Sequence, residues 1–256
     1  MTGERPVALV TGATSTSSLG GSVALRLAER GYDVACTYRS NPEGSGRLIE
    51  ACKELGASAI AVRADVAEDR DCEATIEQVV GRFSRLDALV NNAAVTRPVP
   101  HRDLHELDAG DFHDTFSVNL IGPYQMARAA WGPLRVAGDA AIVNVSSIGS
   151  VTGKASSIAY ATSKGALNTL TLSLARVFAP EVRVNAVIPG GMLGPWTRKI
   201  MTDEEYEVRL RDAADTYPLG RAVMPSDVAA TVCWLIADAP MMTGELIRLD
   251  AGRHLL

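Results

Sequence analysis

The sequence predicts an α/β protein built on one parallel sheet, and three observations carry that prediction. Short runs of β-branched and aliphatic residues alternate with longer amphipathic segments along the chain. These runs are continuously apolar, as expected of strands that helices cover on both faces. Neither a linker-like stretch nor an internal repeat divides the 256 residues, so we expect a single domain over residues 1–256.

The expected strands and helices alternate in order. The apolar runs place seven strands at 6–10, 33–38, 58–63, 87–90, 140–145, 182–188 and 246–250. The amphipathic pattern places helices at 20–31, 44–55, 69–83, 109–135, 157–178 and 225–238, and the glycines of "ERGYD" and "ELGAS" end the first two. Repeated strand–helix units require right-handed crossovers, so the sheet should be parallel, open and doubly wound, with helices on both faces. Residues 189–217 contain no clear element.

Composition and charge exclude several classes of protein. The net charge is -5 and the 25 Lys and Arg are scattered, which argues against nucleic acid as a partner. No apolar stretch reaches the length of a membrane span and no signal peptide is recognisable. The four cysteines include no C-x-x-C pair, so we expect them to be reduced and the protein to be cytoplasmic. His101 and His105 lack a third ligand, and no metal site is predicted.

The stretch "TGATSTSSLGGS", residues 11–22, links the first strand to the first helix. A strand that turns into a helix offers free backbone N–H groups to a phosphate, and sheets of this kind bind ligands at the carboxyl ends of their strands. Gly12 is followed only by Gly20 and Gly21, so the G-x-G-x-x-G spacing is not met. These residues by themselves leave a dinucleotide site and a plain polar turn equally open.

Tyr160 and Lys164 lie four residues apart in an expected helix and therefore share one face. A lysine ammonium near a phenol favours the phenolate and lowers its pKa, which suits a group that transfers protons near neutral pH. Ser146 and Ser147 follow the strand 140–145 and bring hydroxyls to its carboxyl end. A Tyr and Lys pair without such neighbours would more often be a surface pair.

Taken together, the motifs resemble the short-chain dehydrogenase/reductase family over nearly the whole chain. The matching pieces are "NNAA" at 91–94, "VNLIG" at 118–122, "NVSS" at 144–147, "YATSK" at 160–164, "RVNAVIPG" at 183–190, "PLGRAVMPSDVA" at 218–229 and "TGELIRLDAG" at 243–252. The resemblance implies a single-domain Rossmann fold and an oxidoreductase that uses a nicotinamide cofactor. It also implies a catalytic tetrad of Asn119, Ser147, Tyr160 and Lys164.

The resemblance assigns a role to each member of the tetrad. Ser147 polarises the substrate carbonyl, and Tyr160 gives a proton to the developing alkoxide. Lys164 holds the nicotinamide ribose and lowers the pKa of the phenol. Asn119 connects the lysine to solvent through its helix backbone and a water molecule.

The loop after the first strand is similar to that of enoyl carrier-protein reductases, in which a glycine, five residues, a serine, an aliphatic and a small residue follow one another. Gly12, "ATSTS" and then Ser18, Leu19 and Gly20 fit this pattern, which implies a pyrophosphate site. Enoyl reductases carry their lysine seven residues after the tyrosine, where this chain has Leu167. The active site therefore resembles that of carbonyl reductases, and 3-oxoacyl-carrier-protein reductases are the nearest subgroup.

The end of the second strand favours NADP(H) over NAD(H). Tyr38 stands where an acidic residue would bind the ribose 2′-hydroxyl, and Arg39 follows it. A solvated loop cation is the alternative for Arg39. Ser40 and Ser15 offer further donors to a 2′-phosphate. By resemblance, the remaining adenosine contacts are Asp65, Val66, Asn92, Ala93 and Ala94.

One cofactor contact departs from the family pattern. After Pro189 and Gly190, the family often has a threonine that contacts the carboxamide, but this chain has Gly194 at that position. Either the backbone of Gly191 and Met192 makes the contact, or Thr197 replaces the missing threonine.

Residues 190–217 are expected to form a substrate lid with glycine hinges. Met192, Trp196 and Met201 would line an apolar pocket, and Arg198 with Lys199 would meet an acidic group. The same segment is also compatible with a plain helical surface.

The preferred function is NADP-dependent reduction of a ketone or aldehyde, or the reverse oxidation, on a small molecule or acyl thioester. The alternatives are a non-catalytic NADP(H)-binding regulator and an enoyl-thioester reductase. By resemblance, helices 109–135 and 157–178 pair in a homodimer, and the C-terminal strand region completes a homotetramer.

Overall fold

The computed structural model describes residues 5–256, and in this range seven strands form one parallel sheet. The strand order is β3-β2-β1-β4-β5-β6-β7, so the order reverses between β1 and β4. This confirms the predicted doubly wound α/β fold. The strands are β1 Val7–Val10, β2 Asp33–Tyr38, β3 Ala59–Arg63, β4 Ala88–Asn91, β5 Ala140–Val145, β6 Val182–Pro189 and β7 Leu246–Leu249.

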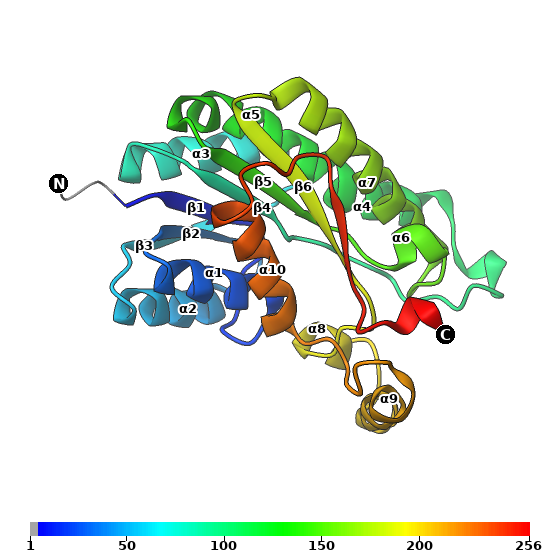
Figure 1. Ribbon diagram of the computed structural model, residues 1–256. Helices are drawn as coiled ribbons and strands as arrows, with labels where there is room; N and C mark the ends of the chain where they lie inside the picture. Colours follow the sequence, from blue (N-terminus) through cyan, green and yellow to red (C-terminus); the bar gives the residue numbers. More distant parts are fainter. Residues whose placement is uncertain (1–4) are drawn as a thin grey trace.

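Helices cover both faces of the sheet (Figure 1). One face carries α1 Leu19–Glu29, α2 Pro42–Glu54 and α10 Pro225–Ala237, and the other carries α3 Asp69–Phe83, α5 Gly122–Ala137 and α7 Ile158–Phe178. Each face has its own large cluster of buried apolar residues. All residues of β1, β4, β5 and β6 are buried, which explains why these strands are continuously apolar in sequence.

The helix expected at 109–135 is interrupted in the structure. It divides into α4 Ala109–Phe116, a π-helical turn Ser117–Ile121 and α5, with the Gly122 N–H donating to the Ser117 carbonyl. Single π turns inside helices are rare and cluster at functional sites. The expected period continues across the interruption, and therefore the sequence pattern did not reveal it.

Residues 189–217 contain helices that the sequence did not predict. They are α8 Pro195–Arg198 and α9 Asp203–Thr216, which lie apart from the two helical layers (Figure 1). The Thr202 side chain caps α9, and the Glu205 side chain accepts a hydrogen bond from the Thr202 N–H in return. Only Tyr206 and Ala213 of α9 are buried, so the helix has almost no apolar period.

Three short turns complete the described elements: Leu104–Glu106, α6 Gly149–Thr152 and Arg253–Leu255. Within residues 5–256, none of the helices combines the length and apolar character needed to cross a bilayer.

Candidate active site

A cleft of about 1590 Å³ lies at the carboxyl ends of the strands. It extends from the loop after β2, past the loop after β1, to α9 and the C-terminal turn. Every predicted catalytic or cofactor-binding residue lines it except Asn119 and Gly190, which are packed behind its wall. The sheet topology explains this convergence, because parallel strands place all of these loops at one edge.

The loop after β1 requires its glycines. Gly12 has a φ of +66°, and a β-carbon there would lie 2.8 Å from the Ala93 Cα. A β-carbon on Gly20 would lie 2.7 Å from Nδ2 of Asn92. That amide group donates to the Thr11 carbonyl at 2.8 Å and the Gly12 carbonyl at 3.2 Å, so it fixes the turn.

Ser18 is the N-cap of α1. Its hydroxyl accepts from the Gly21 N–H at 3.1 Å and donates to the Ser15 carbonyl at 2.8 Å. Gly21 was not assigned a role from sequence, yet a β-carbon there would overlap the Ser15 carbonyl. Ser18, Leu19 and Gly20 line the cleft, so the N-terminus of α1 faces it, and helix N-termini attract anions.

Ser147 lies two residues after the end of β5 and is held by a polar network. Its carbonyl accepts from the Ser150 hydroxyl at 2.6 Å, and its own hydroxyl accepts from the Gly149 N–H at 3.2 Å. Asn168 of α7 donates to the Ser150 hydroxyl at 2.8 Å and accepts from the Ser146 hydroxyl at 2.6 Å. Sequence reasoning missed Asn168, although it lies one turn after Lys164 on the same face of α7.

Lys164 is almost completely buried, at 2% exposure. Its Nζ donates to the Val145 carbonyl at 2.8 Å, which leaves further N–H donors for a ligand in the cleft. Burial lowers the pKa of Lys164 to about 7. The side-chain amine of Lys164 is therefore only partly protonated near neutral pH.

Tyr160 differs from the sequence expectation. Burial raises the pKa of its phenol to about 12, although a hydrogen bond with Ser147 acts in the opposite direction. Lys164 Nζ lies 5.8 Å from the centroid of the Tyr160 ring, but desolvation outweighs any attraction for the phenolate. The expected lowering of the pKa is thus wrong for this structure, and the phenol is a neutral hydrogen-bond donor at pH 7.

Asn119 lies within the π-helical turn and is fully buried. Its carboxamide accepts from the Val95 N–H at 2.9 Å and donates to the Val95 carbonyl at 3.0 Å and the Ser163 hydroxyl at 3.1 Å. The side chain is therefore used in joining the loop after β4 to α7. Any relay through this residue would use its backbone, as the family resemblance implies.

Arg39 follows β2 and lies at the rim of the cleft. Its side chain is 60% exposed, and Nη1 forms a long ion pair of 3.5 Å with Asp65. An exposed pair of this length is weak. The guanidinium is therefore accessible to an anionic ligand.

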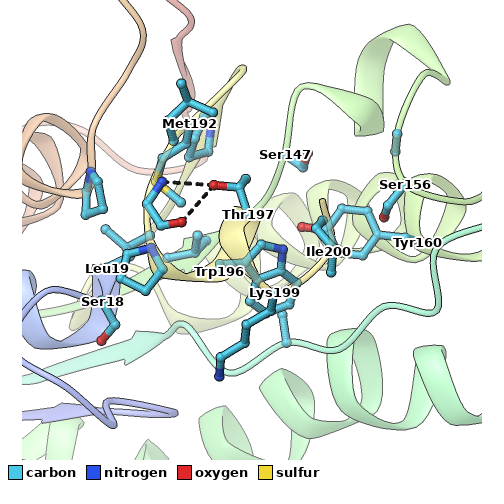
Figure 2. Close-up of a pocket in the computed structure, with 18 of the residues that line it drawn as sticks. Ser18, Leu19, Ser147, Ser156, Tyr160, Met192, Trp196, Thr197, Lys199 and Ile200 are labelled. Carbon is cyan, nitrogen blue, oxygen red and sulfur yellow. Dashed lines mark hydrogen bonds between the residues drawn. The ribbon is translucent and has the colours of Figure 1, made fainter. Parts of the chain in front are cut away.

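Residues of the segment 190–217, which is predicted to be a lid, line the cleft. In the view of Figure 2, Trp196, Lys199 and Ile200 lie between Leu19 on one side and Tyr160 on the other. The Thr197 hydroxyl accepts from the Gly194 N–H at 2.9 Å and donates to the Gly194 carbonyl at 2.8 Å. It therefore keeps capacity to accept one further hydrogen bond, and Met192 lines the same cleft.

Of the two basic residues predicted to meet an acidic group, Lys199 lines the cleft and Arg198 does not. Its guanidinium pairs with Asp203 at 2.7 Å and stacks 3.8 Å from the centroid of Tyr206. The side chain thus joins α8 to α9. Trp196 and Met201 line the cleft as expected.

Comparison with known proteins agrees with this geometry. The family model described as Enoyl-(Acyl carrier protein) reductase matches residues 12–254. The chain is 39% identical, over 99% of its length and 98% of the relative, to a Streptomyces violaceoruber protein assigned as ketoacyl reductase 2 of the granaticin polyketide synthase. It is 34% identical to the 3-oxoacyl-(acyl-carrier-protein) reductase FabG of Staphylococcus aureus, over 97% of the chain and 98% of the relative.

Solved structures show the same architecture. Levodione reductase superposes with a TM-score of 0.88 at 25% sequence identity and covers 98% of both chains. The fold, the site and these matches define an oxidoreductase with a nucleotide-binding sheet. The chain belongs to the short-chain dehydrogenase/reductase family.

Proposed function

We propose that this protein is an NADPH-dependent reductase that converts a ketone or aldehyde to an alcohol, or catalyses the reverse reaction. The observation that carries the proposal is the meeting of Ser147, Tyr160 and the buried Lys164 in one cleft with an open helix N-terminus. A nicotinamide cofactor bound in this cleft supplies the hydride. The names of the ketoacyl reductase and FabG relatives support carbonyl chemistry.

The chain's own residues supply the proton and the polarisation. Ser147 would donate a hydrogen bond to the substrate oxygen, and Tyr160 would transfer its phenolic proton to the same oxygen as negative charge develops. A phenol with a pKa of about 12 is neutral at pH 7 and therefore holds the proton to be delivered. Lys164 would hold the ribose hydroxyls through its unused donors and return a proton toward the phenol.

The cofactor site would use the glycine loop for the pyrophosphate and Arg39 for the 2′-phosphate. Tyr38 provides no carboxylate that would repel this group, and the weak pair with Asp65 leaves the guanidinium accessible. Asn92 and Ala93 are positioned by Thr11, whose hydroxyl accepts from both backbone N–H groups at 3.0 Å. This fixes the wall proposed to contact the adenosine ribose.

Residues 190–217 are proposed to act as a lid. They have a separate small apolar cluster around Leu193, Tyr206 and Ala213, so the segment is suited to move as a unit. Gly191 near its start and Gly220 just after its end have φ values of +62° and +63°. Glycine adopts this left-handed conformation without strain, and these two positions are therefore suitable hinges.

The enoyl reductase alternative is favoured by the family model's description and by the loop pattern. Against it, Leu167 is fully buried in the position where those enzymes carry lysine. Reduction of a conjugated double bond with the carbonyl left intact would restore this alternative. Tight NADPH binding with no reduction of any carbonyl would instead support a regulator.

Association and location belong to the same proposal. Exposed apolar side chains on α5 and α7, including Tyr124, Leu172 and Val177, support a homodimer or homotetramer. Light scattering that shows a monomer would contradict it. The four cysteines are free and buried, which supports a reducing, cytoplasmic location.

The cofactor is tested by titrating the protein with NADPH and NADH while following nicotinamide fluorescence. Wild type should prefer NADPH, and Arg39→Gln should weaken NADPH binding roughly 10- to 100-fold while leaving NADH unchanged. Arg47→Gln is the matched control, because Arg47 is exposed on α2 outside the cleft. Equal affinity for both nucleotides would refute the NADP assignment.

The chemistry is tested with Tyr160→Phe and a panel of ketones and acyl thioesters. Loss of the general acid should lower turnover roughly 10²- to 10⁴-fold, with NADPH affinity nearly unchanged. Turnover equal to wild type would overturn the proposed mechanism.

A further inference from the structure

The C-terminal turn reaches the substrate side of the cleft and is fixed there. Gly252 has a φ of +83°, and a β-carbon on it would lie 2.8 Å from the Pro218 Cβ. The Leu219 N–H donates to the Ala251 carbonyl at 3.2 Å. The turn that begins at Arg253 is therefore packed onto the end of the lid segment, and Arg253 lines the cleft.

The guanidinium of Arg253 has a defined position. Its Cζ lies 5.4 Å from the centroid of the Tyr217 ring, and Nη1 would lie 3.4 Å from a β-carbon built on Gly191. Gly191 is two residues after Pro189, whose carbonyl accepts from the Ile148 N–H at 2.8 Å. Ile148 is the neighbour of Ser147, and both Ser147 and Arg253 line the cleft.

No carboxylate of the described chain neutralises Arg253. Asp250 is the nearest acid in sequence, but its oxygens accept from Nδ1 of His254 at 2.9 Å, from the His254 N–H at 3.0 Å and from the Gly252 N–H at 3.1 Å. Within residues 5–256, Arg253 forms no ion pair. In contrast, Arg39 at the rim of the same cleft pairs with Asp65.

The other charges around the substrate side largely offset one another. The lid contributes two basic residues, Lys199 and Arg209, and three acidic ones, Glu204, Glu205 and Asp212. Its remaining lining is apolar, with Trp196, Ile200 and Met201. Pockets of this composition use a few fixed polar groups to orient a ligand, and an arginine fork matches a planar carboxylate with two parallel hydrogen bonds.

We propose that Arg253 binds a carboxylate on the substrate and thereby selects oxo acids, or the corresponding hydroxy acids, over neutral carbonyl compounds. One unpaired guanidinium matches the single charge of a carboxylate better than the double charge of a phosphate ester. This inference rests on the proposed carbonyl reductase function and names its substrate class. The stack on Tyr217 holds the cation in place before the ligand arrives, which limits the entropy lost on binding.

The test compares acids with matched neutral amides. The probes are 3-oxobutanoate, 4-oxopentanoate and 5-oxohexanoate, each with its carboxamide, and dihydroxyacetone phosphate as a different anion. Wild type with NADPH should show a kcat/KM roughly 10- to 100-fold higher for at least one acid than for its amide. Arg253→Gln should bring the ratio of acid to amide close to one by lowering kcat/KM for the acid far more than for the amide, and Arg253→Lys should keep part of the preference.

Arg211→Gln provides a control, because Arg211 is exposed on the same lid helix as Arg209 but does not line the cleft. It should leave the ratio of acid to amide unchanged. NADPH binding measured by fluorescence confirms that each variant retains a folded cofactor site.

The outcomes separate the inference from the proposed function. Reduction of amides as efficiently as acids, or a preference for the phosphate ester that depends on Arg253, would overturn the carboxylate assignment while leaving carbonyl reduction intact. Failure to reduce any probe would count against the proposed function, and calorimetry of the same acids with NADP⁺ present then decides the inference. Equal binding to wild type and Arg253→Gln, or no binding to either, would overturn it.

Discussion

Replacement of Lys164 by methionine should stabilise the folded protein near pH 6 and destabilise it near pH 10. The lysine is 2% exposed, and burial lowers its pKa from the ordinary value of 10.5 to about 7. Below pH 7 it is protonated in both the folded and the unfolded chain, so the folded state carries the full cost of a buried cation. Between pH 7 and 10.5 the unfolded chain binds more protons, and the stability of wild type therefore rises with pH.

The magnitude follows from the pKa. The fall from 10.5 to about 7 corresponds to at most about 5 kcal/mol at 1.36 kcal/mol per pH unit. Methionine avoids this cost but loses the 2.8 Å hydrogen bond to the Val145 carbonyl, which costs about 1 to 3 kcal/mol. We therefore expect a net gain of about 2 to 4 kcal/mol at pH 6. Near pH 10 the avoided cost falls below about 1 kcal/mol, and the variant becomes the less stable protein.

Urea unfolding of the protein without nucleotide, at one fixed protein concentration, measures both values. Lys53→Met is the control, because Lys53 is 49% exposed and pairs with Glu50 at the surface. The difference in the free energy of unfolding between Lys53→Met and wild type should keep the same sign at pH 6 and pH 10. The reasoning would be refuted if Lys164→Met were less stable than wild type at pH 6. It would also be refuted if the difference in the free energy of unfolding between the two proteins did not change with pH.

Two further predictions concern the loop and the serine network. Gly12→Ala should lower the free energy of unfolding more than Gly31→Ala, because Gly12 combines a φ of +66° with a close approach to the Ala93 backbone, whereas Gly31 has a φ of +89° with open space around it. The backbone strain common to both variants should cost about 1 to 3 kcal/mol in thermal unfolding. NADPH binding should weaken only for Gly12→Ala. Asn168→Leu removes the hydrogen-bond partner of the Ser146 and Ser150 hydroxyls. Because this network is expected to position Ser147, kcat should fall while the Kd for NADPH stays constant. An unchanged kcat would show that the network does not position Ser147.

The sequence was sufficient for the fold because the central strands β1, β4, β5 and β6 are buried on both faces and the helices that cover them have an apolar side. These patterns are local in sequence, so the alternation of strands and helices could be recognised without knowledge of the tertiary contacts. The tetrad and the cofactor contacts were predicted from the resemblance to the family, and all of these residues except Asn119 and Gly190 line one cleft in the structure. Helix α9 was missed because only two of its side chains, Tyr206 and Ala213, are buried and its amphipathic period is weak.

What the sequence by itself determined is therefore the sheet, its order of elements and the residues at its carboxyl edge. Only the tertiary structure determined the pKa values of Tyr160 and Lys164, because the pKa of a group depends on how far its neighbours exclude water from it. Lys164 and Tyr160 lie four residues apart in either description, but only their burial shows that the lysine pKa is lowered and the phenol pKa is raised. The position of Arg253 was likewise decided in three dimensions, because the C-terminal turn meets the lid through contacts between segments distant in sequence.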